Sequence, residues 1–242
     1  MVRGKASSKG IVAVILGAGQ GVRMGYQINK VFLPINGKPI IMYAVETFER
    51  CEAIDEIMLV VAAGEEEHMT KLARHAQCAK VSWVIRGGQT RHESEQCALE
   101  VLRPHIDAGE VEMVLIHDGA RPFVSVEKVE QLIARAREAD GAILAVSLQE
   151  EERIAQVSSE QYVQRSYEGQ QVWKAQTPQA FQAVLLLKAY DQARRDQFSG
   201  TDTAASVERS GGHIVIVESD AGNLKITTAQ DLFLAERLVR QF

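Results

Sequence analysis

Residues Ile11-Val-Ala-Val-Ile-Leu-Gly-Ala-Gly-Gln-Gly-Val-Arg-Met24, followed by Lys30, join an apolar run to a glycine-rich loop. The run is short and rich in β-branched residues, which is typical of a buried parallel strand. The three glycines lack a Cβ, so their backbone N–H groups can come close to an anion. Arg23 and Lys30 then supply positive charge. The pattern predicts a strand that ends in a polyphosphate-binding loop; the alternative is a tight strand-to-helix turn with a solvated arginine.

Two better-known glycine loops do not fit the spacing. A dinucleotide fingerprint needs a third glycine where this chain has Val22, and an acidic residue about 20 positions later. A P-loop needs Gly-Lys-Ser/Thr, whereas Gly21 is followed by Val-Arg. The sequence therefore argues against an NAD-binding dehydrogenase and against a P-loop enzyme.

Composition narrows the class of protein. The chain has 242 residues, 46% of them hydrophobic and 24% charged, which is typical of a globular protein. Its net charge of −5 gives no general attraction to nucleic acid or to an anionic membrane, so local cations must hold any anionic ligand. The three cysteines are widely spaced and form no C-x-x-C pair, which fits a reducing compartment and a cytoplasmic location. No apolar run is long enough to span a membrane.

Strand-like and helix-like segments alternate along the chain, which predicts a mostly parallel sheet with helices on both faces. We expect strands at residues 11–16, 57–62, 81–85, 113–117, 142–148 and 213–217, and helices at 40–51, 65–75, 94–102, 125–139, 181–195 and 229–242. The third helix is expected to end before Pro104. Residues 149–171 are polar and rich in turn formers, and we expect a protruding hairpin or arm there. The sequence thus predicts one domain, residues 1–242, with an arm at about 149–171.

A second polar motif, His117-Asp118-Gly-Ala-Arg121-Pro122, directly follows the apolar strand at 113–117. Ligands of open α/β sheets bind at the carboxyl ends of the strands. Asp118 is therefore a candidate ligand for Mg²⁺, which prefers one or two carboxylates together with substrate phosphates. Arg121 would pair with that carboxylate or with a phosphate. The alternative is an exposed Asp-Gly turn.

Three further segments carry polar residues next to predicted strands or helices. In Gly87-Gly-Gln-Thr-Arg91-His-Glu-Ser94, the Ser94 hydroxyl would contact a base edge or ribose, or else would cap a helix. Gln176-Thr-Pro-Gln179 contains a rigid, extended dipeptide that starts a helix or shapes a wall of the site. Asn223-Leu-Lys225-Ile-Thr227 places a lysine in a short β-like segment, either solvated or as a third cation.

Taken together, these segments resemble the 2-C-methyl-D-erythritol 4-phosphate cytidylyltransferases and, nearly as closely, the ribitol-5-phosphate cytidylyltransferases. The shared motifs occur in the same order between residues 12 and 232: G-x-G-x-R-M with a downstream lysine, K-P-I, GG-x-x-R-x-x-S, HD-x-ARP, TPQ-x-F, TD-x-A and N-[IL]-K-[IV]-T. The resemblance implies a Rossmann-like nucleotidyltransferase fold and a homodimer joined through its arms. It also implies CTP and Mg²⁺, attack of the acceptor phosphate on the α-phosphorus, and release of pyrophosphate.

The resemblance also implies roles for individual residues. Arg23, Lys30 and Lys225 would be catalytic, and Asp118 would bind the metal. The residues expected to bind CTP are Leu16, Gly17, Ala18, Gly19, Gly21, Gly87, Gly88, Ser94 and Ala120. Those expected to bind or support the acceptor are Arg121, Glu151, Arg165 and Asp202.

The chain departs from the family pattern mainly in the arm. Glu150 and Glu151 stand where the family has Asp-Thr, and a carboxylate there would repel an incoming phosphate. Arg165 matches the acceptor-binding arginine only if an insertion of about four residues is allowed. Thr203 replaces an acid after Thr-Asp. These arm changes leave nucleotide transfer well supported and the acceptor open. The resemblance favours 2-C-methyl-D-erythritol 4-phosphate, with ribitol 5-phosphate, another polyol phosphate, or CTP binding without turnover as the alternatives.

Overall fold

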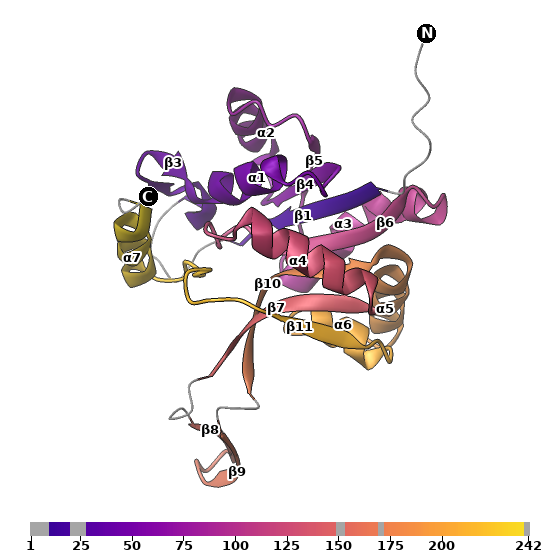
Figure 1. Cartoon of the computed structure of the whole chain (residues 1–242), viewed down its shortest axis with the longest axis vertical. Helices are drawn as coiled ribbons and strands as arrows, with labels where there is room; N and C mark the ends of the chain where they lie inside the picture. The colour runs from indigo at the N-terminus through magenta and orange to yellow at the C-terminus, as the bar shows by residue number, and fades with distance from the viewer. Residues whose placement is uncertain (1–9, 20–27, 149–152, 169–171, 240–242) are drawn as a thin grey trace.

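A seven-stranded sheet forms the centre of the protein in the computed structural model, which describes residues 10–19, 28–148, 153–168 and 172–239 (Figure 1). Its strands are β1 (Gly10–Leu16), β4 (Glu56–Val61), β5 (Val81–Arg86), β6 (Val111–Asp118), β7 (Gly141–Ser147), β10 (Trp173–Gln182) and β11 (Ile214–Glu218). Their order is β11-β7-β10-β6-β1-β4-β5. Only β10 runs antiparallel to its neighbours, so the predicted mostly parallel sheet is confirmed.

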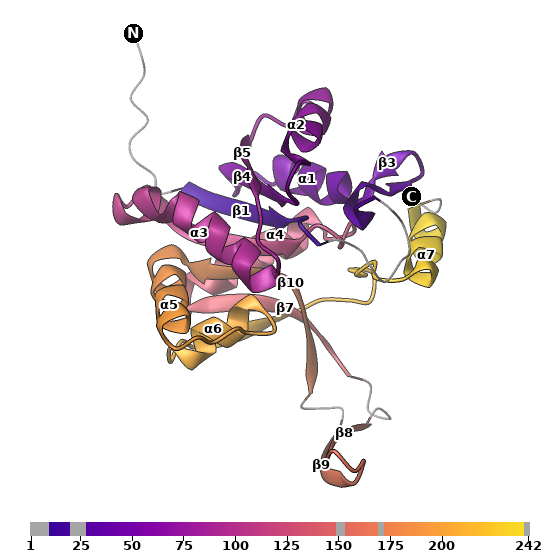
Figure 2. The ribbon, with the colours of Figure 1, turned by 180° about the vertical axis from the view of Figure 1, so that it is seen from behind.

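Helices cover both faces of the sheet, as predicted (Figures 1 and 2). Alternate residues of β1 point to opposite faces, so Ala13 and Ile15 join one core cluster while Val12 and Val14 join the other. The first cluster packs against α1 (Ile40–Arg50), α2 (Glu66–His75) and α4 (Val126–Arg137). The second packs against α3 (Arg91–Asp107), α5 (Ala183–Arg195) and α6 (Thr203–Arg209). Burial on both sides explains why the strands are continuous apolar runs.

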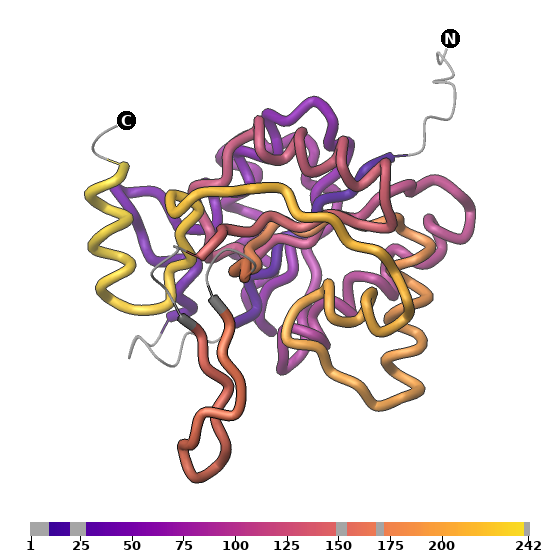
Figure 3. Tube along the Cα trace, turned by 60° about the horizontal axis from the view of Figure 1, so that its bottom comes forward, coloured from indigo at the N-terminus to yellow at the C-terminus, as the bar shows by residue number. Residues whose placement is uncertain are grey.

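A third, smaller core brings the C-terminal helix close to the end of β1. Helix α7 (Ala229–Val239) packs against the hairpin of β2 (Pro34–Ile35) and β3 (Lys38–Pro39), where the C-terminal and N-terminal parts of the chain lie side by side (Figure 3). Ile226 is fully buried in this core, and its N–H donates to the Ala120 carbonyl at 2.8 Å. The expected β-like segment at residues 223–227 forms no strand. The burial of Ile226 and hydrogen bonds to backbone and side chains, including those of Asn223 to Gln176 and Thr177, hold it in place.

The structure extends the third predicted helix, expected at residues 94–102, at both ends: α3 spans Arg91–Asp107. It begins at Arg91 because the Thr90 side chain accepts a hydrogen bond from the Glu93 N–H, and Glu93 in turn accepts from the Thr90 N–H. It also continues past Pro104 to Asp107. Proline near the last turn removes only one helical hydrogen bond, and Ile106 beyond it is buried in the core.

Two elements of the C-terminal half were not predicted. Strand β10 inserts between β6 and β7, so the helix expected from residue 181 begins only at Ala183. Its pairing with β7 shifts register between Ala175 and Gln179, where the cis Thr177–Pro178 bond lies. A proline without an N–H is accommodated at such an irregularity. Helix α6 is the second element that was not predicted. Asp202 caps it by accepting a hydrogen bond from the Ala205 N–H at 3.0 Å.

The predicted arm is a two-stranded hairpin. Strands β8 (Arg153–Val157) and β9 (Val163–Glu168) pair antiparallel and project away from the sheet (Figures 1 and 3). Tyr162 and Val163, which are 71% and 60% exposed, present apolar surface on it. Within the parts of the chain that the structure describes, no helix is long and apolar enough to cross a membrane.

Candidate active site

A pocket of about 250 Å³ opens at the carboxyl ends of β1 and β6. From β1 the chain continues to β4 and β5 on one side and returns to β6 on the other, so the strand order reverses between β1 and β6. Open α/β sheets bind ligands at such a reversal. The sequence-predicted residues that line the pocket are Leu16, Ala18, Gly19, Lys30, Gly88, Ser94, Asp118, Ala120 and Lys225.

The two glycine-rich segments pack against each other beneath this pocket. A Cβ on Gly87 would meet Ala18 Cβ and Ser94 Oγ, each at 2.7 Å, and one on Gly17 would meet Ile41 Cδ1 at 2.9 Å. Only glycine fits at such close approaches. Gly17 and Gly87 are therefore placed behind the lining, whereas nothing would lie within 4 Å of a Cβ on Gly19.

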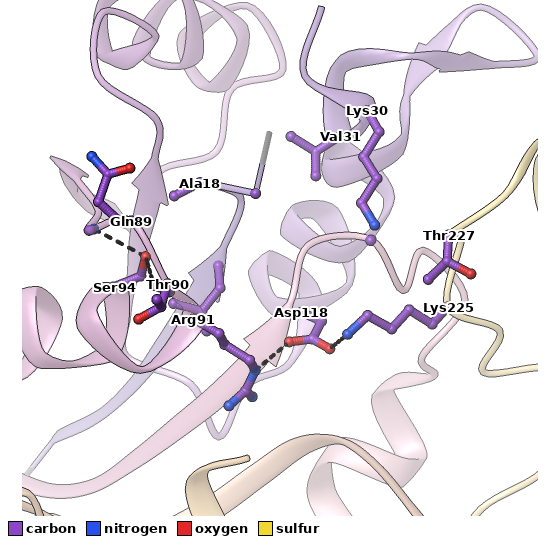
Figure 4. Close-up of a pocket in the computed structure, with 14 residues that line it drawn as sticks. Ala18, Lys30, Val31, Gln89, Thr90, Arg91, Ser94, Asp118, Lys225 and Thr227 are labelled. Atoms are coloured by element: carbon purple, nitrogen blue, oxygen red, sulfur yellow. Dashed lines mark hydrogen bonds and ion pairs between the residues drawn. The ribbon is translucent and has the colours of Figure 1, made fainter. Parts of the chain in front are cut away.

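Asp118, the last residue of β6, stands at the centre of the pocket. Its Oδ1 accepts from Arg91 Nε at 3.1 Å and its Oδ2 from Lys225 Nζ at 2.6 Å (Figure 4). Burial disfavours the charged carboxylate, but Arg91 and Lys225 outweigh that effect and hold the pKa of Asp118 well below its usual range. Asp118 is therefore an ionised, largely buried carboxylate at neutral pH.

Arg91 is the charged pocket residue to which the sequence analysis gave no role. Its Nη1 donates to Glu95 Oε1 at 2.6 Å and to Thr203 Oγ1 at 3.3 Å. Because its Nε also donates to Asp118, the guanidinium lies between the carboxylates of Glu95 and Asp118. Burial disfavours its charge, but Glu95 and Asp118 prevail and raise the pKa of Arg91. The GG-x-x-R-x-x-S motif already contained this arginine, and its place three residues before Ser94 was the available signal.

Lys30 is the third cation that lines the pocket, after Arg91 and Lys225. It begins a 3₁₀ turn, Lys30–Phe32, and the Asn29 side chain accepts from the Val31 N–H at 3.3 Å. Lys30 Nζ donates to the Ile226 carbonyl at 3.0 Å. The same segment thus carries Lys225 and positions Lys30, which brings both predicted catalytic lysines to one pocket (Figure 4).

A buried hydrogen-bonded chain supports Asp118 from below. The Asp118 N–H donates to Thr177 Oγ1 at 3.0 Å, which lies 3.3 Å from His117 Nδ1. His117 Nε2 lies 3.0 Å from the Arg121 carbonyl, an acceptor only, so Nε2 carries the proton and Nδ1 accepts from the Thr177 hydroxyl. Burial lowers the pKa of His117 to about 4, which keeps this imidazole neutral.

Three predicted acceptor residues lie outside the pocket lining. Arg121 is buried below the site, where its Nη1 donates to the Asn223 carbonyl at 2.7 Å. Asp202 caps α6 and accepts from Gln179 Nε2 at 2.9 Å. Arg165 lies on the arm, with its guanidinium 4.8 Å from the centre of the Tyr167 ring. Their acceptor-binding role stays a prediction. Gly21, Arg23 and Glu151 lie outside the described residues.

Comparisons with known proteins agree on one family. The family model for 2-C-methyl-D-erythritol 4-phosphate cytidylyltransferase matches residues 11–241. The chain is 40% identical over 229 residues to the enzyme of that name from Shouchella clausii, covering 95% of this chain and 96% of the relative. It is 37% identical to the one from Geobacillus kaustophilus, covering 94% and 96%.

Solved structures give the same result. The 4-diphosphocytidyl-2C-methyl-D-erythritol synthase of Anaerococcus prevotii superimposes with a TM-score of 0.82 at 28% identity, over 96% of each chain. The 2-C-methyl-D-erythritol 4-phosphate cytidylyltransferase of Thermus thermophilus does so with a TM-score of 0.73 at 29% identity, over 94% of this chain and 98% of the other. The expected Rossmann-like nucleotidyltransferase fold is confirmed, and the chain belongs to the 2-C-methyl-D-erythritol 4-phosphate cytidylyltransferase family.

Proposed function

We infer that this protein is a CTP-dependent cytidylyltransferase acting on 2-C-methyl-D-erythritol 4-phosphate in isoprenoid-precursor synthesis. An oxygen of the acceptor phosphate attacks the α-phosphorus of CTP, the bond from that phosphorus to the β-phosphate bridging oxygen breaks, and pyrophosphate leaves. The observation that carries this function is the meeting of Asp118, Arg91 and Lys225 at the end of β6, with Lys30 in the same pocket. The family match names the acceptor.

The reaction requires positioning and charge neutralisation rather than a covalent nucleophile. We assign Lys30 and Lys225, with Arg23, to neutralise the triphosphate and the charge that develops during transfer. Ala18, Gly19, Gly88 and Ser94 all line the pocket. We assign Ala18 and Gly19 to the triphosphate and Gly88 and Ser94 to the cytidine. Gly88 N–H donates to Ser94 Oγ at 3.2 Å, which keeps the hydroxyl in one place.

Mg²⁺ fits the donor set around Asp118. Within the described residues no cluster of three or more His, Cys, Asp or Glu could hold a metal alone, so substrate oxygens and water would complete the coordination of an ion on Asp118. One ionised carboxylate together with phosphates is the arrangement that Mg²⁺ prefers. When bound, the ion would supply further charge neutralisation on the phosphates. Asp118 would hold it, while Lys225, now on Asp118 Oδ2, would face the phosphates.

The arm supplies the acceptor side in our proposal. We assign Arg165, Glu151, Arg121 and Asp202 to bind or support the acceptor, in a single 1–242 domain with its arm at about 149–171. The exposed apolar side chains of the arm support a homodimer joined through the arms. We place the protein in the cytoplasm because its three cysteines are widely spaced and form no C-x-x-C pair. Arg165 projects with its own arm away from the sheet, so a partner copy would bring it to a site.

Pyrophosphate release tests the function directly. The purified protein is supplied with Mg²⁺, each of the four NTPs, and either 2-C-methyl-D-erythritol 4-phosphate, ribitol 5-phosphate or another polyol phosphate. We expect release with CTP and 2-C-methyl-D-erythritol 4-phosphate, and its loss with EDTA. Faster release with ribitol 5-phosphate would reassign the acceptor. CTP binding without release from any acceptor would identify a homologue without turnover.

A further inference from the structure

Glu95 is an acidic residue buried outside the pocket lining. It lies one turn after Arg91 on α3, and its side chain is 1% exposed. Thr203 Oγ1 donates to its Oε1 at 2.5 Å and Tyr190 Oη donates to its Oε2 at 2.5 Å. These hydroxyls come from α6 and α5, so the carboxylate joins three helices on one face of the sheet. A carboxylate this deeply buried is stable only when it is paired and hydrogen-bonded.

The partner that matters for the site is Arg91. Its Nη1 contacts Glu95 Oε1 while its Nε contacts Asp118 Oδ1, so one guanidinium connects the buried carboxylate to the pocket carboxylate. The planar group has fixed donor directions, and holding one edge restricts the other. Without Glu95, Arg91 would retain only Asp118 and the Thr203 hydroxyl as partners among the described residues.

Thr203 gives the arrangement a second feature. It stands where the family resemblance expects an acid, and its Oγ1 lies 3.3 Å from Arg91 Nη1. The carboxylate of Glu95 reaches Arg91 from α3, while α6 offers the Thr203 hydroxyl at the same nitrogen. The two positions therefore offer alternative supports for the same guanidinium.

We propose that Glu95 is a positioning residue for cytidylyl transfer, which holds Arg91 and thereby fixes the Asp118 carboxylate in the pocket. This inference rests on the proposed function. Glu95 touches no substrate; it acts through Arg91, and α6 contributes to the site through the Thr203 hydroxyl.

The test compares the parent with Glu95→Gln and with the double variant Glu95→Gln/Thr203→Glu. We expect Glu95→Gln to lower kcat/KM for CTP by about 10- to 100-fold, as is typical when the group that orients a ligand is removed. Thr203→Glu should then restore most of the loss, because it returns a carboxylate to Arg91 from the other helix. Glu100→Gln, an exposed acid of the same helix that pairs with Arg103, is the matched control and should leave kcat/KM unchanged.

Two further measurements separate positioning from folding. Tyr190→Phe removes only the hydroxyl on Oε2, and should lower kcat/KM less than Glu95→Gln while the protein stays folded. Calorimetry of Mg²⁺–CTP binding to each folded variant should show the same order of effects as turnover. If the parent is active and Glu95→Gln is equally active, the positioning role is wrong. It is also wrong if the double variant recovers thermal stability but not kcat/KM. Either result would leave the proposed function intact. A parent that neither binds CTP nor releases pyrophosphate would overturn the proposed function together with the positioning role.

Discussion

Charge balance around Asp118 is the main feature of the site at the scale of single residues. Arg91 and Lys225 reach the carboxylate from opposite sides, and each occupies one oxygen (Figure 4). A buried carboxylate with two cations is compensated twice, so it keeps a partner when one cation turns toward a phosphate. The site can therefore release Lys225 to a substrate without leaving an unpaired charge.

Lys225→Ala should reduce turnover far more than stability. Loss of one group that stabilises transition-state charge typically costs about 10²–10³ in rate, whereas Asp118 retains Arg91 as a partner in the folded protein. Steady-state kinetics and urea unfolding of the same preparation check this. Lys71→Ala is the matched control, because Lys71 is an exposed lysine that pairs with Glu67 on α2. An unchanged kcat/KM in Lys225→Ala would remove this lysine from the mechanism.

Because His117 is buried and neutral, we expect the folded protein to lose stability in weak acid. The pKa of His117 is about 4 in the folded protein because of burial, against 6.5 for an ordinary histidine. Between these values the unfolded chain binds the proton and the folded chain does not, so the unfolding free energy falls as pH drops from 6.5 to 4. The difference corresponds to about 3 kcal/mol at most.

Urea unfolding of the parent and of His117→Gln at pH 7 and pH 5 measures this contribution. The parent should lose stability over that interval, and the variant should lose less of it. Asp118 acts in a lower window, because its depressed pKa means that its share is lost only as pH falls further. Parallel pH profiles for parent and variant would contradict the role of His117.

Helix α3 positions two of the polar side chains that line the pocket, Arg91 and Ser94. Its first turns carry Arg91, Ser94 and Glu95, and its N-terminus is held by the reciprocal Thr90–Glu93 hydrogen bonds. The same end packs against the loop at Gly88, where an added Cβ would come within 2.3 Å of Glu93 Cβ. The start of this helix therefore sets the position of both the cation and the hydroxyl in the site.

Thr90→Ala should destabilise the protein by about 1 kcal/mol and also raise KM for CTP. Loss of the cap frees the turn that carries Arg91 and Ser94, and Thr90 itself lines the pocket. Ser125→Ala is the matched control, because Ser125 caps α4 in the same way and α4 supplies no residue to the pocket lining. We expect similar losses of unfolding free energy in the two variants, but a changed KM only in Thr90→Ala. Equal KM values would show that the cap matters for folding alone.

The arm dominates the shape of the whole molecule. It carries Ile154, Val157, Tyr162 and Val163 as exposed apolar side chains on a two-stranded hairpin (Figure 1). An isolated hairpin of two strands is at best marginally stable in water. Packing against a second copy would bury these side chains, which is the physical reason for the proposed dimer.

Val163→Lys should therefore weaken self-association. The new charge would have to be buried in the arm contact, and sedimentation at several concentrations should show a shift toward monomer together with lower turnover. Val184→Lys is the matched control, since Val184 is 51% exposed on α5, away from the arm. A parent that is monomeric at all concentrations would refute the arm-joined dimer.

The sequence by itself determined most of the strands and helices and most of the residues that gather at the sheet edge. Continuous β-branched runs require burial on both faces, and parallel strands bring Leu16 and Asp118 to the same edge, where they are register partners. Such features depend on local pattern, so they can be predicted without a tertiary structure. The pocket positions of Lys30 and Lys225 followed from the family resemblance.

Only the tertiary structure decided which groups touch. Strand β10 enters between β6 and β7 although it contains Pro178, because its irregular register spares the missing N–H. Arg91, Glu95 and Thr203 form one hydrogen-bonded group, yet Thr203 lies 108 positions after Glu95 in the chain. Such pairings depend on how helices from distant parts of the sequence pack on one face of the sheet, and no local spacing encodes that geometry.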